Sequence, residues 1–211
     1  MDVAPLERML AHVAGLAGSD SRVLTRDPGE VVSAGALGAA RLVVVEEGLV
    51  VVRGGRTPDW RLVVKRFAGG GSILLPPAAD ESIGVLAAAR VRTLSERAVT
   101  RLVSDESAAL FLLGGLEASL RSTDETLGAL AHVHHVDRVR DLLLQLARAH
   151  GRVDRNAGVR IDLPLTHELV AQAVASARET VSRAIEALER DGFVTRDGGG
   201  AYRVLVPPET L

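Results

Sequence analysis

Apolar and polar positions follow different periods along the chain, and each change of period predicts a different kind of element. In residues 4–17, apolar side chains recur every three or four positions, which predicts a short amphipathic helix. From Arg22 to about Val103, short runs of Val, Ile and Leu alternate with Gly, Pro and Asp, which predicts many strands and tight turns. We therefore expect an antiparallel sandwich or barrel in this part of the chain.

A helical period returns between Asp105 and His135. Leucines fall on alternating three- and four-residue steps that continue to His134, with Thr123 at one core position, and this spacing is typical of a coiled-coil seam. A helix packed on its own β domain would give the same short pattern, so both interpretations stay open at this point. The seam leucines are Leu113, Leu116, Leu120, Leu127 and Leu130.

The pattern in the last part of the chain predicts, in this order, a helix, a polar loop, a second helix, a turn, a third helix and a hairpin. The stretch "VDRVRDLLLQLARAHG" is an amphipathic helix that ends at Gly151, and "RVDRNAGVRIDLP" is a polar loop with one short strand. Thr166 is a suitable N-cap for the helical run "HELVAQAV", and "GFVTRDGGGAYRVLV" predicts a hairpin around residues 198–200.

Between these elements lies a second helix with two distinct faces. Val181, Ile185 and Leu188 share one side, so we expect them to be buried. The polar side chains gather on the other side near the N-terminal end of the helix, which is where a recognition helix contacts base pairs. These polar residues are Arg178, Glu179, Ser182 and Arg183.

The run "LTHELVAQAVASARETVSRAIEALERDGFV" resembles the DNA-binding helix-turn-helix of the cyclic-AMP receptor and fumarate-nitrate reduction regulator family of bacterial transcription factors. "GEVVSAGALGAARLVVVEEGLVVVR" resembles the opening of that family's β-roll, with turns expected at Gly29-Glu30, Gly35 and Glu47-Gly48. The leucine seam resembles the family's dimerisation helix. The resemblance implies an α+β fold with an antiparallel β-roll in residues 1–103, a dimerisation helix and hinge in 104–135, and a winged helix-turn-helix in 136–211.

The same resemblance implies roles for single residues. Arg178 and Arg183 match arginines that read guanine, whose O6 and N7 accept a bidentate guanidinium, and Glu179 matches a glutamate that accepts from a cytosine amino group. Ser182 is the fourth expected base-reading residue. Thr166, Gln172 and Thr180 are expected at the phosphate backbone, where a hydroxyl or amide positions the protein without specifying sequence.

Three positions depart from the family pattern, which usually has glutamate, glycine and serine where this chain has Leu169, Ala175 and Ala177. The usual turn and N-cap chemistry are therefore absent. Ser176 and Glu179 are spaced to form a capping box instead, which would move the helix start by one residue and occupy Glu179.

The β-roll of cyclic-nucleotide-binding members pairs an arginine with the cyclic phosphate. Here "SILLPP" follows Gly71 without an acidic residue, no arginine follows Glu81, and Arg90 and Arg92 lie too far along the chain. We therefore expect no usual binding of cyclic AMP, and either another small-molecule effector or none. The candidate effector residues are Gly70, Gly71, Thr123 and Asp124; Thr123 matches a base-contacting threonine, although a polar residue that sets the register of the seam is an equal interpretation.

Composition narrows the function classes. The 25 basic and 27 acidic side chains nearly cancel, so DNA binding must come from a local surface. The absence of cysteine excludes thiol catalysis, disulfides and cysteine-ligated iron-sulfur clusters. No histidine lies between Ala14 and Ala131, which argues against a cupin-like metal enzyme in the β domain. His132, His134 and His135 form a cluster in which a shared metal or simple packing at the hinge are alternatives.

We expect no enzyme activity, no cofactor and no membrane span. The expected partners are a second copy of the chain, pseudo-palindromic promoter DNA and, for an activator, RNA polymerase, in the cytoplasm. The other hypothesis is a protein-interaction module whose winged helix binds a partner protein.

Overall fold

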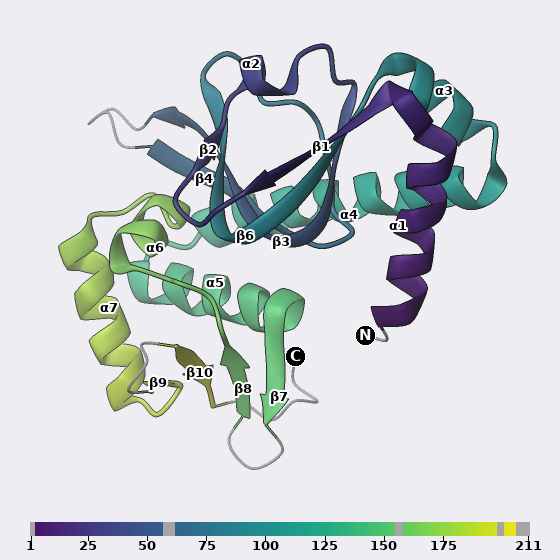
Figure 1. Cartoon of the computed structure of the whole chain (residues 1–211). Coiled ribbons are helices and arrows are strands. Elements are labelled where there is room, and N and C mark those ends of the chain that lie inside the picture. Colours follow the sequence, from purple (N-terminus) through teal and green to yellow (C-terminus); the bar gives the residue numbers. More distant parts are fainter. Residues whose placement is uncertain (1–2, 57–61, 155–157, 198–200, 206–211) are drawn as a thin grey trace. The chain divides into compact units, whose positions relative to one another are not determined.

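The computed structural model describes residues 3–56, 62–154, 158–197 and 201–205 (Figure 1). Contacts divide the chain into two compact units, Met1–Gly54 with Arg66–Ser122 and Gly55–Lys65 with Thr123–Leu211. The division falls inside the long helix α4 (Glu106–Leu130). Among the described residues, no helix combines the length and the apolar character needed to cross a bilayer.

The first unit is built on an antiparallel sheet, which confirms the expected β domain. The strands run in the order β1-β6-β3-β4, with β2 paired to β6 and β5 paired to β3. The helices are α1 (Val3–Ala17), η1 (Gly18–Asp20), α2 (Ala34–Leu37) and α3 (Glu96–Val103). The strands are β1 (Ser21–Arg26), β2 (Val31–Val32), β3 (Leu42–Arg56), β4 (Leu62–Gly69), β5 (Ile73–Leu74) and β6 (Glu81–Leu94).

The two faces of this sheet bury different sets of side chains. Val43 and Val45 of β3 belong to an aliphatic cluster inside the roll, whereas Leu42 and Val44 belong to a cluster that includes residues of α1, α3 and α4. Successive side chains of a strand point to opposite faces, so a strand that is covered on both sides is apolar at every position. This explains the unbroken run Leu42–Val45.

A β-bulge interrupts the pairing of β3 with β6. The register shifts at Glu47 and again before Leu49 and Val50. Gly48 has a φ of 83°, and a Cβ there would lie 2.1 Å from the carbonyl oxygen of Ala88, so only glycine fits. The expected turn at Glu47-Gly48 is wrong, because β3 continues through the bulge. Gly35 lies within the short helix α2, and of the three expected turns only the one at Gly29 stands.

The predicted end of the β region, at about Val103, is also wrong. Residues 96–103 form α3 and not a strand, with Ala98 and Leu102 buried. The Ser95 hydroxyl caps the helix by accepting from the Ala98 amide at 3.3 Å.

Helix α4 has features of both interpretations of the leucine pattern, a helix packed on its own β domain and an exposed seam. Ala108 and Leu112 are buried in the first unit, whereas Leu113, Leu120 and Leu127, seven residues apart, are 65%, 69% and 61% exposed. Asp105 caps the helix, since its carboxylate accepts from the Ala108 amide at 2.9 Å. The helix ends at Leu130, so the expected continuation of the helical seam to His134 is wrong.

The second unit contains a four-stranded antiparallel sheet in the order β7-β8-β10-β9, and α7 packs on α5 and α6. The stretch after Gly151, expected to be a polar loop with one short strand, contains two paired strands, β7 and β8. The expected hairpin is confirmed, with Val194 opposite Val204. Residues 198–200, around which that hairpin was expected to turn, lie outside the described residues. The elements are α5 (His135–His150), β7 (Gly151–Asp154), β8 (Gly158–Ile161), α6 (His167–Ala173), α7 (Arg178–Arg190), β9 (Val194–Arg196) and β10 (Tyr202–Val204).

Candidate DNA-binding surface

The first helix of the helix-turn-helix begins where the sequence predicts. The Thr166 hydroxyl accepts a hydrogen bond from the Leu169 amide at 3.1 Å, which confirms Thr166 as the N-cap of α6. Leu169 and Val170 are then buried, so the glutamate that the family usually has at position 169 is replaced here by a core side chain.

The turn between α6 and α7 holds an alanine in a left-handed conformation. Ala175 has a φ of 47°, and it is the sole non-glycine residue with positive φ within the described ranges. The Ser176 amide closes the turn by donating to the Ala171 carbonyl at 2.9 Å. The chain therefore keeps the backbone shape for which glycine is suited, at the cost of steric strain around the alanine Cβ.

Helix α7 begins at Arg178 without a side-chain cap. Its N-cap is Ala177, and the Ser176 hydroxyl lies 3.1 Å from Nδ1 of His135. The expected capping box between Ser176 and Glu179 is therefore wrong. Glu179 is exposed and takes part in no side-chain cap of α7 among the described residues, so its carboxylate is available to a ligand.

The two faces of α7 separate as the sequence predicts. Val181, Ile185 and Leu188 are 0%, 2% and 0% exposed. Arg178 and Arg183 are exposed on the other side, near the N-terminal end of the helix. Within the described parts of the chain, neither guanidinium forms an ion pair. An unpaired guanidinium on a helix surface can donate two parallel hydrogen bonds to a planar acceptor pair.

A hydrogen-bond chain joins α6, α7 and the β9–β10 hairpin, and sequence spacing gave no signal for it. Nη2 of Arg196 donates to Nε2 of His167 at 2.5 Å, and Nδ1 of His167 lies 2.7 Å from the Ser182 hydroxyl. A guanidinium only donates, so Nε2 must accept and the proton of a neutral imidazole must lie on Nδ1. The Ser182 hydroxyl in turn donates to the Arg178 carbonyl at 3.0 Å.

Electrostatics favour the same neutral imidazole. Burial lowers the pKa of His167 below its ordinary value, and the positive charges of Arg196 and Arg178 lower it further. Arg196 also donates to the Tyr202 hydroxyl at 2.6 Å and lies over the Tyr202 ring. Ser182, expected to read bases, is thus occupied by contacts within the protein.

The three residues expected at the phosphate backbone differ in their surroundings. Thr166 is exposed and Thr180 is half-buried. The Gln172 amide nitrogen donates to Glu168 at 3.3 Å, and its carbonyl oxygen is buried without a hydrogen-bond partner among the described residues. Gln172 is therefore held against its own helix.

The expected effector residues are divided between the two units, with Gly70 and Gly71 in the first and Thr123 and Asp124 in the second. Gly70 and Gly71 form the turn between β4 and β5 and line a mostly apolar pocket of about 580 Å³, with Leu6 and α4 residues between 110 and 118. Thr123 and Asp124 are not among the described residues that line it. The roll interior itself is filled by the aliphatic cluster that includes Val43, Val45 and Val91.

The histidines at the start of α5 have separate partners. Nε2 of His132 lies 2.7 Å from the Asp141 carboxylate, and His135 contacts Ser176. Among the residues that the structure describes, no three His, Cys, Asp or Glu side chains are grouped as a metal site.

An antiparallel β-roll in one unit and a winged helix-turn-helix in the other define a class of transcription regulator. Residues 137–209 match the Crp-like helix-turn-helix domain family. A global nitrogen regulator of Synechocystis sp. is 35% identical over 86 residues, which are 41% of this chain and 38% of that protein. The CRP-like cAMP-activated global transcriptional regulator of Mycobacterium tuberculosis is 29% identical over 165 residues, which are 75% of this chain and 73% of that protein.

Solved structures agree over most of the chain. A CRP-family transcriptional regulator of Thermus thermophilus aligns with a TM-score of 0.67 and 25% identity, over 87% of this chain and 92% of that one. A cyclic nucleotide-binding domain containing protein of Listeria monocytogenes has the same fold, with a TM-score of 0.77 at 16% identity over 94% and 97% of the two chains. Residues 137–209 therefore belong to the Crp-like helix-turn-helix domain family, and the similarities over the rest of the chain support a Crp/Fnr-type transcription regulator.

Proposed function

We propose that this protein is a homodimeric regulator that binds a specific pseudo-palindromic promoter sequence through α7. The observation that carries the proposal is that Arg178 and Arg183 are exposed, without an ion pair among the described residues, on a helix whose other face is buried. Each guanidinium matches the O6 and N7 acceptors of guanine, and Glu179 matches the amino group of cytosine. Ser182 acts by positioning, because His167 and the Arg178 carbonyl occupy its hydroxyl.

The proposed dimer forms through α4. The exposed leucines Leu113, Leu120 and Leu127 repeat every seven residues, which is the period of a two-helix seam. Leaving such a row in water is costly, since a buried leucine side chain contributes roughly 1.5–3 kcal/mol. A second copy of α4 offers the same row of leucines and supports a symmetric interface.

Binding of DNA by this protein does not need cyclic AMP in our proposal. Aliphatic side chains fill the roll interior, and Ala89 and Val91 point into it. Arg90 and Arg92 alternate with them along β6 and so lie on the opposite face of the strand. The mycobacterial relative is named for its activation by cAMP, so the two proteins would differ in their effector.

The test is selection from a random library of DNA duplexes with the purified, ligand-free protein. We expect a two-fold symmetric motif whose half-sites lie about one helical turn, or roughly 34 Å, apart. Enrichment of a single half-site would contradict the dimer, and recovery of no motif would contradict sequence-specific binding. Because this DNA-binding role places the protein with the chromosome, we expect it in the bacterial cytoplasm.

A further inference from the structure

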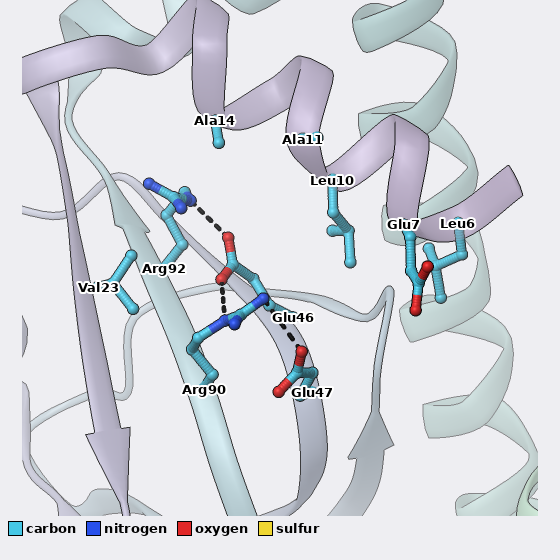
Figure 2. Close-up of a pocket in the computed structure, with 10 residues that line it drawn as sticks. All are labelled: Leu6, Glu7, Leu10, Ala11, Ala14, Val23, Glu46, Glu47, Arg90 and Arg92. Atoms are coloured by element: carbon cyan, nitrogen blue, oxygen red, sulfur yellow. Dashed lines mark hydrogen bonds and ion pairs between the residues drawn. The ribbon is translucent and has the colours of Figure 1, made fainter. Parts of the chain in front are cut away.

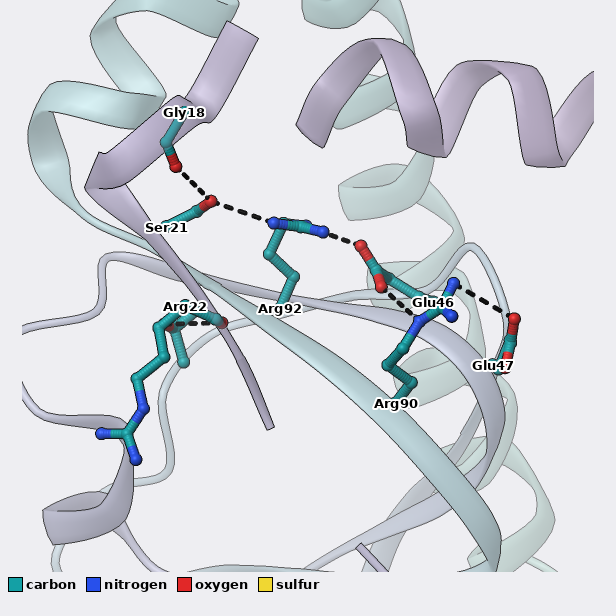
Figure 3. A network of polar contacts seen from close by, with 8 residues as sticks. Gly18, Ser21, Arg22, Glu46, Glu47, Arg90 and Arg92 are labelled. Carbon is teal, nitrogen blue, oxygen red and sulfur yellow. Dashed lines mark hydrogen bonds and ion pairs between the residues drawn. The ribbon is translucent and has the colours of Figure 1, made fainter. Parts of the chain in front are cut away.

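A polar network in each unit joins side chains from separate elements. In the first unit, Glu46 of β3 accepts from Nε of Arg92 at 2.6 Å and from Nε of Arg90 at 2.7 Å, both on β6. Figure 2 shows this cluster beside a pocket of about 570 Å³ that α1 also lines, and Figure 3 follows it to the Ser21 hydroxyl, 3.0 Å from Nη1 of Arg92. Both arginines have a carboxylate partner within the chain, so this network holds strands together.

The network in the second unit connects the β9–β10 hairpin to the start of α7 through the imidazole of His167. Nη2 of Arg196 on β9 donates to Nε2 of His167 on α6, and Nδ1 of the same ring lies 2.7 Å from the Ser182 hydroxyl on α7. The Ser182 hydroxyl then donates to the Arg178 carbonyl. Three elements that are well separated in sequence therefore meet at one side chain.

Each hydrogen bond of this chain fixes the direction of the next one. A guanidinium only donates, so Nε2 of His167 accepts, and a neutral imidazole then carries its proton on Nδ1. A hydroxyl has one hydrogen, which Ser182 gives to the Arg178 carbonyl, so Ser182 must accept from Nδ1. The two ends of the chain therefore require the same tautomer of His167, with a single proton on the ring.

The donor at the hairpin end of the chain is held by its cross-strand neighbour. Arg196 lies opposite Tyr202 in the register of β9 and β10, and the Tyr202 side chain is buried. Nη2 of Arg196 also donates to the Tyr202 hydroxyl at 2.6 Å, and the guanidinium carbon lies 4.8 Å from the centroid of the ring. A guanidinium that is bound by both a ring and a hydroxyl has little freedom to turn away from His167. The position of the hairpin is thus linked to α6.

The other end of the chain acts on the first turn of α7. The helix begins at Arg178, and its N-cap, Ala177, provides no side-chain hydrogen bond. Ser182 holds the Arg178 carbonyl while Ser182 is itself bound by His167. The fixed carbonyl belongs to the residue whose guanidinium is proposed to read guanine. The hairpin and α6 therefore set the backbone position from which the Arg178 side chain extends.

A second proton on His167 would break the chain at Arg196. The charged side chains that face the ring are Arg196 from β9 and Arg178, Glu186 and Glu189 from α7. Burial and the two arginines lower the pKa of His167, and the two glutamates, which are exposed, oppose them. In an imidazolium both nitrogens donate, so Nε2–H would face a donor of the same charge on the guanidinium.

We propose that Arg196 and His167 are positioning residues for sequence-specific DNA binding, which requires a neutral His167. A proton then acts as a negative effector, because protonation of His167 releases the hairpin from α6 and reduces discrimination between DNA sequences. Nonspecific attraction to phosphates is not reduced, since an added positive charge favours it. This inference rests on the proposed function of α7 and adds its regulation.

The test compares the affinities for the selected duplex and for a scrambled duplex, by fluorescence anisotropy at constant ionic strength from about pH 8 to about pH 5. The ratio of the two affinities measures discrimination between sequences. We expect this ratio to fall at least about tenfold in the wild type when His167 is protonated, which histidine NMR follows in the same buffers. A ratio that stays constant or rises while NMR shows protonation of His167 would overturn the proposal.

Arg196→Met removes the donor and its charge, so it should lower the ratio about tenfold at about pH 8 and leave little pH dependence. Arg203→Met is the matched control. Arg203 lies on β10 beside Tyr202, so its side chain points to the other face of the hairpin, and its ratio should stay within about twofold of the wild type. Equal ratios in the wild type and Arg196→Met at about pH 8 would refute the positioning role.

A double-mutant cycle with Ser182→Ala distinguishes one connected chain from two separate effects. Both substitutions break the same chain, so the double variant with Arg196→Met should be no less selective than either single variant. Losses that multiply would show that the two residues act independently and would overturn the proposal.

Failure of this proposal differs from failure of the proposed function. A wild-type protein that binds both duplexes equally at about pH 8 would contradict sequence-specific binding itself, and this proposal with it. A wild-type preference that survives both Arg196→Met and Ser182→Ala would contradict the role of the chain alone.

Discussion

Single residues carry the features in which this helix-turn-helix departs from its family. Alanine replaces glycine at position 175, and the sequence shows this departure but not how the chain accommodates it. The structure shows that the turn is preserved and that Ala175 adopts a φ of 47°. The family shape is therefore maintained by the packing of α6 and α7 around the turn, and the alanine is strained.

Ala175→Gly should stabilise the protein. A left-handed alanine costs about 1–2 kcal/mol, and glycine loses about 0.4–1 kcal/mol through its more flexible unfolded chain, so a net gain of about 0.5–1 kcal/mol is expected. Chemical denaturation of the two proteins measures the change. The control Ala149→Gly, at a helical position, should instead destabilise by up to about 1 kcal/mol. A loss of stability in Ala175→Gly would contradict the strained turn.

His167 is the second residue whose role only the structure reveals. Its partners Ser182 and Arg196 are 15 and 29 positions away, and no local pattern links positions so far apart. The neutral imidazole is the form that accepts from Arg196.

The pKa of His167 should therefore lie below 6.5 in a histidine NMR titration, with burial as the main cause. Arg196→Gln removes a nearby positive charge and should raise this pKa toward its ordinary value. Since the pKa is lowered in the folded state, the stabilisation is complete above pH 6.5 and is lost as the pH falls through the lowered pKa. A His167 pKa at or above 6.5 would argue against the hydrogen-bond chain.

At the scale of elements, a strong period of apolar side chains was sufficient to predict a helix from the sequence, and a weak period was not. Helices α1, α5 and α7 could be predicted because each has an apolar stripe that packs on a core. The seven-residue helix α6 could be predicted because Thr166 marks its N-cap and the stretch resembles a helix-turn-helix. Helix α3 was missed because eight residues after a long strand give only two turns of pattern. Only one of the strands β7 and β8 was predicted, because the charged residues of this stretch, such as the exposed Arg152, give it the composition of a loop.

Leu120→Glu should dissociate the proposed α4 dimer. A charge at the centre of an apolar seam is left without a partner, so we expect dimerisation to weaken at least about 100-fold. Sedimentation velocity measures this change. Leu75→Glu is the matched control, because Leu75 is 62% exposed and lies outside α4. If both variants sediment as the wild type does, the seam is not the dimer interface.

At the scale of the whole molecule, the net charge and the local surface of α7 have different consequences for the proposed binding of DNA. The formal charge of −2 gives no long-range attraction to DNA, so in our proposal the affinity comes from the few side chains that α7 presents. The fold class and the buried face of α7 could be predicted from sequence. The hydrogen bond between Ser182 and His167 and the ion pair between Arg90 of β6 and Glu46 of β3 could not, because each joins residues from separate elements.

The most direct test of the central claim is a fluorescence anisotropy titration of the selected duplex at near-physiological salt. Arg178→Ala should cost about 1–3 kcal/mol of specific binding and relax the preference for guanine at one position of each half-site. Arg190→Ala, at the other end of the same helix, is the control and should bind within about twofold of the wild type. An Arg178→Ala protein that binds the duplex as tightly and as selectively as the wild type would contradict recognition of DNA by α7.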